Sequence, residues 1–202
     1  MLNKLIFFWK QSWLLLLASF LFGLMIAVAD SAWSPKVEAN KVAKVKNLMS
    51  GLINAASFDV AVKDANIQGD KGFFKTDIYK ALDAQGNVLG FEYIVYGPGF
   101  GDKIELVIAV DAACEKYLGY QVLSSNETPG FGDKIKTDYF RNQFINAPAV
   151  EVELVKVGDP QVIDKDIVAI GGATITSTAV VNIFNKSLVS VKEILSQKGL
   201  IK

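Results

Sequence analysis

The hydrophobic pattern of the chain separates an uncharged apolar segment near the N-terminus from a mixed region that follows it. Residues 11–29 carry no charge and consist mostly of Leu, Ala, Phe, Val and Ile. As a helix with a rise of about 1.5 Å per residue, this run nearly spans a hydrocarbon core of about 30 Å. Trp9, Trp13 and Trp33 lie near its ends, as is typical of side chains at a membrane interface. The pattern predicts one transmembrane helix within a membrane anchor of residues 1–33.

The same segment has a second interpretation as a cleaved signal peptide. Ala27-Val28-Ala29 has the A-x-A form of a cleavage site. The apolar run is longer than the usual h-region of about 7–15 residues, which favours a retained anchor. Fewer lysines precede the run than follow it closely, which alone would place the C-terminal side in the cytoplasm. Because long downstream domains translocate largely regardless of charge, the lysines leave the side of the membrane open.

After the anchor, the periodicity is first helical and then strand-like. Ser34-Pro35 is typical of a helix start, and apolar residues three and four apart over residues 37–55 predict an amphipathic helix. Its apolar positions are Val42, Val45, Leu48, Met49 and Leu52. Residues 77–84 and 88–96 flank Gln85-Gly86-Asn87, which predicts a β-hairpin.

The remainder of the chain continues the strand pattern and ends in a helix. Residues 104–113 and 118–124 are further candidate strands. The last helix runs through Leu195, and its apolar stripe consists of Val180, Phe184, Leu188, Val191 and Leu195. Four to six antiparallel strands with helices at both ends predict an α+β fold: an antiparallel sheet with flanking helices, preceded by one N-terminal transmembrane helix. We assign residues 34–202 to this domain.

The composition excludes several classes of redox and binding site. The chain has no histidine, which removes imidazole bases, His-ligated haem and most zinc sites. Cys114 is the single cysteine, so an internal disulfide and a four-cysteine iron–sulfur cluster are excluded, and we expect it to be a buried apolar residue. Lys and Arg number 21, as do Asp and Glu, so the chain has no basic field for nucleic acid. Any redox chemistry must use an organic cofactor, and we expect no metal site and no catalytic residue.

One internal repeat lies in the predicted sheet region. The sequence PGFGDKI at residues 98–104 recurs at residues 129–135, each time after a strand-like segment. A duplicated hairpin, in which the glycines adopt positive φ in matching turns, would explain the repeat. It leaves unexplained the extension of the second copy by Asn126-Glu127-Thr128.

Residues 169–180, AIGGATITSTAV, predict an anion site at the start of the last helix. The small residues are Gly171, Gly172 and Ala173, and the hydroxyl side chains are Thr174, Thr176, Ser177 and Thr178. The glycines let the backbone approach a ligand closely, and the free N–H groups and dipole of the helix favour an anion such as a phosphate. A P-loop has a Lys after its glycines, whereas this segment offers hydroxyls. We expect Thr176 or Ser177 to cap the helix.

Two motifs resemble one known family. The segment at residues 169–180 resembles the GAT-type flavinylation motif of the FMN-binding domain family, in which a Thr hydroxyl is joined to the phosphate of FMN; Thr174 is the matching position. Residues 127–134, ETPGFGDK, resemble the ETPG-x-G-x-K segment of the G subunit of the Rnf electron transport complex. They are also similar to that of the C subunit of the sodium-translocating NADH:quinone reductase. Anchor, ETPG segment and GAT motif together extend the resemblance over nearly the whole chain.

The resemblance implies a membrane-anchored flavoprotein that relays electrons within an Rnf-type ion-translocating ferredoxin:NAD oxidoreductase. FMN would be bound covalently as a phosphoester of Thr174, after attachment by a separate flavin transferase. The surrounding cofactor-binding residues would be Gly171, Gly172, Ala173, Thr176 and Ser177. Expected partners are the other membrane subunits of the complex in the cytoplasmic (inner) membrane, with a single membrane pass and the soluble domain on the extracytoplasmic side.

The resemblance also assigns roles to the ETPG segment. Glu127 and Thr128 would hydrogen-bond the flavin ring or ribityl chain, while Gly130 shapes the loop. Lys134 would stabilise a reduced, anionic flavin or a phosphate oxygen, with an exposed surface lysine as the alternative. Phe131 would cover the ring, or else belong to the core.

Two positions depart from the family pattern. The family commonly reads Asp-x-x-Ser/Thr-Gly-Ala-Thr, and the first and fourth positions are here Val168 and Gly171. Asp166 or Asp164 is a candidate replacement for the missing acidic side chain. These departures put the efficiency of flavin attachment in doubt and keep a flavin-free, membrane-tethered assembly module as an alternative. The second alternative is the equivalent subunit of a sodium-translocating NADH:quinone reductase.

Overall fold

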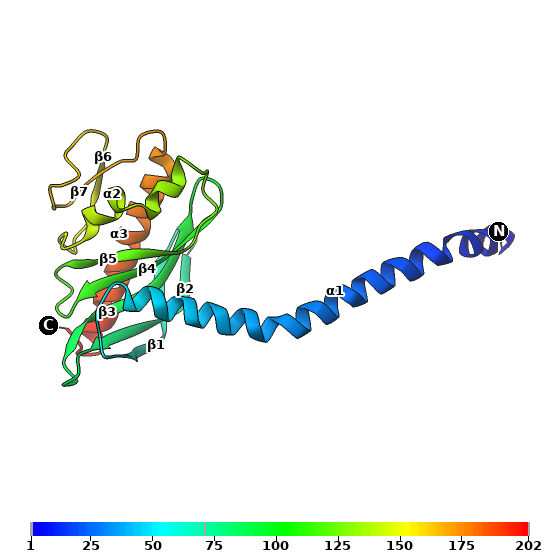
Figure 1. The fold of residues 1–202 in the computed structure, drawn as a ribbon, viewed down its shortest axis with the longest axis horizontal. Helices are drawn as coiled ribbons and strands as arrows, with labels where there is room; N and C mark the ends of the chain where they lie inside the picture. Colours follow the sequence, from blue (N-terminus) through cyan, green and yellow to red (C-terminus); the bar gives the residue numbers. More distant parts are fainter. Residues whose placement is uncertain (1, 71, 202) are drawn as a thin grey trace. The chain divides into compact units, whose positions relative to one another are not determined.

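The computed structural model describes residues 2–70 and 72–201, with side chains described for Phe7 and from Lys10 onward. Its longer elements are α1 (Leu2–Ser50), β1 (Ser57–Gly69), β2 (Gly72–Leu82), β3 (Val88–Pro98), β4 (Lys103–Asp111), β5 (Tyr117–Ser124) and α3 (Thr174–Gln197). The shorter ones are the 3₁₀ helices η1 (Gly132–Lys136) and η2 (Asn142–Phe144), the helix α2 (Asp138–Arg141), and the strands β6 (Glu153–Val155) and β7 (Asp166–Val168). The α+β prediction is confirmed (Figure 1).

The N-terminal helix is longer than predicted. The helix start expected at Ser34-Pro35 is wrong, because α1 continues through Pro35 to Ser50. Proline lacks the N–H for one intrahelical hydrogen bond, and the helix here tolerates that loss. The part Lys10–Ser50 is long and apolar enough to cross a membrane, since it contains an 18-residue window with a mean hydropathy of 2.3. The chain divides into two compact units, Met1–Lys44 and Val45–Lys202, so the last turns of α1 belong to the same unit as the sheet.

The larger sheet is an antiparallel meander in the order β1-β2-β3-β4-β5. The predicted hairpin between β2 and β3 is present, and the Asp83 carboxylate accepts hydrogen bonds from the backbone of Gln85 and Asn87. The strand expected at residues 77–84 begins earlier, at Gly72, and β1 was not predicted. Two register shifts in β1 break its period-two alternation, which is the signal from which a strand is recognised.

Helix α3 packs along one face of this sheet (Figure 1). All five residues of its predicted apolar stripe are buried, and they meet alternate residues of β3, namely Phe91, Tyr93 and Val95. Cys114 is buried in the same core, as expected. We call this the inner face of the sheet.

The opposite, outer face is also covered around its centre. Glu92 of β3 and Ala109 of β4 are directly paired on that face, and both are fully buried. Met49 at the end of α1 and Ile53 just after it are buried as well, and Ile53 packs in a small cluster with Ala81 and Ala109. The outer face of the sheet is therefore dry at this point.

The two copies of the repeat have different conformations. The first copy forms the connection between β3 and β4, whereas the second leads from β5 into η1. Of the four glycines in the two copies, Gly130 alone has a positive φ, 77°. The expected pair of matching left-handed turns is therefore wrong, since only the second copy contains one.

Candidate functional site

Three loops that are distant in sequence form one open cavity of about 440 Å³. The first copy of the repeat contributes Phe100, and the ETPG segment contributes Thr128, Phe131 and Gly132. The start of α3 contributes Gly172, Ala173, Thr174, Ile175 and Thr176. β3 ends and β4 begins at the first of these loops, β5 ends before the second, and β7 ends before the third. The structure thus joins the two motifs that the sequence singled out.

A buried carboxylate holds the three loops together. Glu127 is only 6% exposed, and its Oε1 accepts hydrogen bonds from the backbone N–H groups of Phe100 (2.9 Å) and Gly101 (3.0 Å). Its Oε2 accepts the hydroxyl of Thr176 at 2.5 Å. A carboxylate that receives three donors is well satisfied inside a protein. Glu127 is therefore a structural link behind the cavity wall, and the second copy of the repeat needs its Glu-Thr extension for this reason.

Glycine is required where the repeat passes this carboxylate. A Cβ on Gly99 would lie 2.3 Å from Oε1 of Glu127, and one on Gly132 would lie 2.7 Å from Oε2. Both distances are shorter than any real contact of a Cβ. Glycines at these two positions thus let the backbone of both repeat copies lie close to the Glu127 side chain.

The helix start differs from the expected capping arrangement. The N-cap of α3 is Ala173, with no side-chain capping bond, so the prediction that Thr176 or Ser177 caps the helix is wrong. Ser177 is fully buried; its Oγ accepts the N–H of Ile170 and donates to the carbonyl of Ala173. These two bonds close the Ile170–Ala173 turn from inside. The hydroxyls of Thr176 and Ser177 are therefore both engaged with protein groups.

Among the hydroxyl side chains of the GAT segment, that of Thr174 is left facing the cavity. It is exposed at the first position of α3, and no described residue hydrogen-bonds its Oγ1. The hydroxyl of Thr178 is exposed too, but it donates to the carbonyl of Thr174 and does not line the cavity. Because the first turn of α3 has no side-chain cap, its N–H groups and the positive end of its dipole remain available to an anion.

Gly172 brings the two motifs into contact. Its φ is +77°, a conformation that favours glycine, and a Cβ there would lie 3.1 Å from the ring of Phe131. The aromatic ring of the ETPG segment thus lies directly against the GAT turn. Phe131 and Phe100 are 53% and 64% exposed, so both rings remain open to a ligand in the cavity.

The other predicted site residues lie outside the cavity lining. Gly171 is exposed, with open space around the place of a Cβ, and Gly130 forms the left-handed turn of the ETPG segment. Lys134 is exposed in η1, away from the lining residues. Their roles toward a cofactor stay predictions.

The positions that depart from the family pattern are accounted for locally. Val168 is buried, and the side-chain amide of Gln143 bonds both its backbone N–H (2.7 Å) and its carbonyl (3.3 Å). Gln143 thus fixes β7 immediately before the GAT turn. Asp164 is exposed and accepts the N–H of Asp166, while one carboxylate oxygen of Asp166 is buried without a partner among the described residues.

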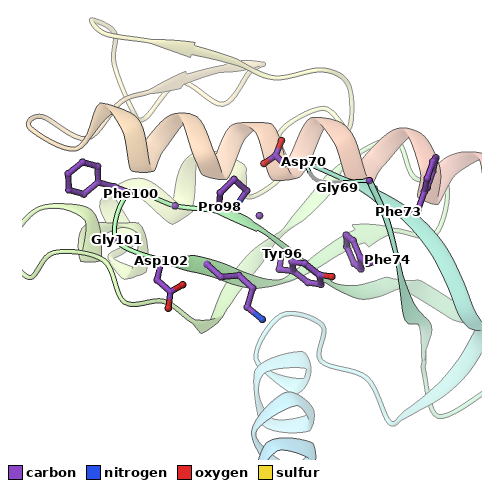
Figure 2. A pocket seen from close by; sticks show the side chains of 13 residues that line it. Gly69, Asp70, Phe73, Phe74, Tyr96, Pro98, Phe100, Gly101 and Asp102 are labelled. Atoms are coloured by element: carbon purple, nitrogen blue, oxygen red, sulfur yellow. The ribbon is translucent and has the colours of Figure 1, made fainter.

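Phe100 is a site residue that sequence reasoning missed. It corresponds to Phe131 in the repeat, and this equivalence was the available signal. Phe100 also borders a second cavity of about 380 Å³, which lies between the β1–β2 and β3–β4 connections (Figure 2). In that cavity the ring centroids of Phe74 and Tyr96 are 4.3 Å apart. The Nζ atom of Lys103 lies 5.0 Å from the centroid of the Tyr96 ring. Phe73 and Phe100 stand at its opposite ends.

Comparison with known proteins agrees with this geometry. The FMN-binding domain family matches residues 99–189, a range that includes both motifs and all residues of the first cavity. The crystal structure of Shewanella oneidensis NqrC shares the fold, with a TM-score of 0.57 and 21% identity over 72% of this chain and 71% of that one.

Two curated relatives match longer parts of the chain. The G subunit of an ion-translocating oxidoreductase complex from Methanosarcina acetivorans is 34% identical over 54% of this chain, and the match spans 55% of that relative. The G subunit of the proton-translocating ferredoxin:NAD(+) oxidoreductase complex from Clostridium ljungdahlii is 32% identical over 82% of both chains. The chain therefore belongs to the family of G subunits of ion-translocating oxidoreductase complexes.

Proposed function

We propose that this chain is the electron-carrying flavoprotein subunit of an Rnf-type ion-translocating ferredoxin:NAD oxidoreductase complex. In this proposal FMN is joined through its phosphate to Oγ1 of Thr174. The observation that carries it is the exposed hydroxyl of Thr174 in the cavity at the uncapped start of α3, while the hydroxyls of Thr176 and Ser177 are occupied. The occupied hydroxyls of Thr176 and Ser177 support Thr174 over its neighbours as the attachment point.

The residues present fit an FMN group. The N–H groups at the start of α3 suit the phosphate, because they are uncapped and the helix dipole favours negative charge. Phe100 and Phe131 offer two exposed aromatic rings to a flat heterocycle. Thr128 lines the same cavity, and in this proposal its hydroxyl hydrogen-bonds the cofactor. Glu127 acts behind this surface, by fixing the loops that carry both phenylalanines and Thr176.

Attachment and electron transfer make different demands on the protein. Attachment joins Oγ1 of Thr174 to phosphorus, with loss of the hydroxyl proton and of the leaving group of an activated flavin donor; a separate flavin transferase would catalyse it. Bound FMN supplies reversible uptake and release of electrons. The protein tunes that chemistry through hydrogen bonds, charge and burial, and needs no catalytic base of its own.

The test is the covalent bond itself. Full-length protein is co-expressed with a flavin transferase, and a denaturing gel is viewed under ultraviolet light. We expect a fluorescent band for the natural chain and for Thr178→Ala, and none for Thr174→Ala. Intact mass should show the FMN increment on the same two proteins. A fluorescent Thr174→Ala band, or a colourless natural chain, would contradict the proposal.

The surrounding assembly belongs to the same proposal. We infer that α1 anchors the chain in the cytoplasmic membrane and that the flavin domain lies on the extracytoplasmic side, beside other membrane subunits. Protease treatment of intact spheroplasts should then cut the flavin domain. Intact mass of the mature chain separates a retained anchor from a cleaved leader. The proteins that copurify with the chain distinguish an Rnf-type complex from a quinone reductase.

A further inference from the structure

Glu92, in the middle of β3, is a buried acid that the flavin site does not use. Its side chain is 0% exposed, and within the described residues neither carboxylate oxygen has a hydrogen-bond partner at normal distance. A buried carboxyl without a partner is costly, and an ionised one far more so. Such a group calls for an explanation.

Glu92 lies in a hollow of the outer face that small residues create. Directly across the sheet from it are Tyr79 on β2 and Ala109 on β4, and Ala109 pairs in turn with Gly119 on β5. The next row of the same face pairs Ala81 with Gly90. The small side chains leave room over β3, β4 and β5 for another segment.

Residues 51–55, which we call the lid, fill that hollow. The Ile53 side chain lies over Gly90, 2.9 Å from where a Cβ would be, and Leu52 lies over Gly119 at 3.6 Å. Ile53 is buried in a cluster with Ala81 and Ala109, against which Leu52, Ala55, Phe58 and Leu118 pack. The contacts between the lid and the sheet are made by apolar side chains. The lid also connects α1 to β1, so its packing fixes the end of the helix on the domain.

The charged groups around Glu92 do not compensate for the free-energy cost of ionising its buried carboxyl. Its nearest titratable neighbours by strand position are Tyr79 opposite and Asp77 and Asp111 on the diagonals. Farther along the same face are Lys75, Tyr96, Lys103 and Glu105, and the last turn of α1 carries the exposed Lys46. Lys103 is paired with Glu105. Among the described residues, no basic group lies directly opposite Glu92 on β2 or β4, so these strands offer its ionised form no ion pair.

We propose that Glu92 is a protonation switch for the lid: residues 51–55 stay packed on the sheet while the carboxyl is neutral and leave it when the carboxyl ionises. Opening the lid gives the charged group water at the cost of a small apolar cluster, whereas the strands and α3 stay intact. Burial raises the pKa of Glu92 to about 8, and the backbone N–H of Ile53 acts in the opposite direction. The switch therefore works close to neutral pH and does not depend on flavin.

Hydrogen exchange on the full-length protein in detergent tests this. Protection of the amides of Ile53 and Ala56, which bond Met49 and Leu82, is measured at pH 6 and pH 9 after correction for intrinsic rates. Between pH 6 and the pKa near 8 we expect protection in the lid to fall about tenfold per pH unit and to level off above it, with α3 amides unchanged. In Glu92→Gln the lid should keep its protection at both values.

Matched measurements separate this switch from general loosening. Glu115→Gln removes an exposed acid and should behave like the natural chain. If Glu92→Gln does not fold, Glu92→Met is used, and the natural chain alone still decides the matter. Equal lid protection at pH 6 and pH 9 in the natural chain overturns the proposal, as does a tenfold loss that persists without the carboxyl.

Discussion

The hydroxyl of Thr176 donates a 2.5 Å hydrogen bond to Oε2 of Glu127, across 49 residues of sequence. This pair joins the first turn of α3 to the ETPG segment, while the other carboxylate oxygen holds Phe100 and Gly101. One buried side chain thus sets the separation of the three loops around the cavity. Geometry at the cofactor site depends on it even though it does not line the cavity.

Replacing that carboxylate should loosen the site. In Glu127→Gln one strong acceptor becomes an amide N–H donor, so at least one of the three bonds is lost or reversed. We expect the free energy of unfolding to fall by about 1–3 kcal/mol, together with a lower yield of flavinylated protein. Thermal unfolding and the fluorescent gel measure the two effects. Glu115→Gln, on an exposed turn, is the control; unchanged stability and yield in Glu127→Gln would contradict the structural role.

Local patterns predicted most of the fold. The apolar stripe of α3 and the β2–β3 hairpin follow from periodicity and turn residues that lie close together in sequence. The hydrogen-bond partner of the Thr176 hydroxyl could not be predicted in this way, because it is a side chain from another loop. Phe100 was missed for the same reason, since only sheet pairing brings the first repeat copy beside the GAT turn.

Two further errors have physical causes in particular residues. Pro35 indicates a helix start when its neighbours are considered alone, yet the helix before it is already formed and continues. The repeat predicts matching left-handed turns, but neither glycine of the first copy has a positive φ, and Gly99 lies instead against the Glu127 side chain. In both cases a contact or an element from a neighbouring segment overrides the local preference.

The turn that presents Thr174 should depend on Ser177. Its hydroxyl is fully buried and bonds both Ile170 and Ala173, so Ser177→Ala leaves the Ile170 N–H without a partner. We expect a loss of about 1–3 kcal/mol in the free energy of unfolding. Thr178→Ala removes an exposed hydroxyl one residue away and should change stability by less than about 0.5 kcal/mol. Chemical denaturation of both variants decides this; equal stabilities would show that the internal bonds of the turn contribute nothing.

Phe131 should contribute to flavin affinity independently of the covalent bond. In a Thr174→Ala background, added FMN can bind reversibly, and Phe131→Leu should weaken its Kd roughly two- to tenfold through loss of aromatic contact. Phe100→Leu should act in the same direction. Phe73→Leu serves as the control, because Phe73 is 65% exposed and lines the second cavity instead. Fluorescence titration measures all three, and an effect of Phe73 equal to that of Phe131 would count against a ring site between the phenylalanines.

The stability of the domain should fall as pH rises toward 8, because of Glu92. An unfolded glutamate loses its proton near its ordinary pKa of 4.5, whereas burial raises the pKa of Glu92 in the folded protein to about 8. Between these values the folded state holds a proton that the unfolded state has released, so the free energy of unfolding decreases with pH, by up to about 1.4 kcal/mol per unit. Other groups titrate equally in Glu92→Gln, so the difference between the two proteins isolates this carboxyl. Urea unfolding at pH 5.5, 6.5 and 7.5 should therefore show Glu92→Gln gaining stability over the natural chain at each step. A difference that stays constant with pH would mean that Glu92 titrates normally and is not buried in the native protein.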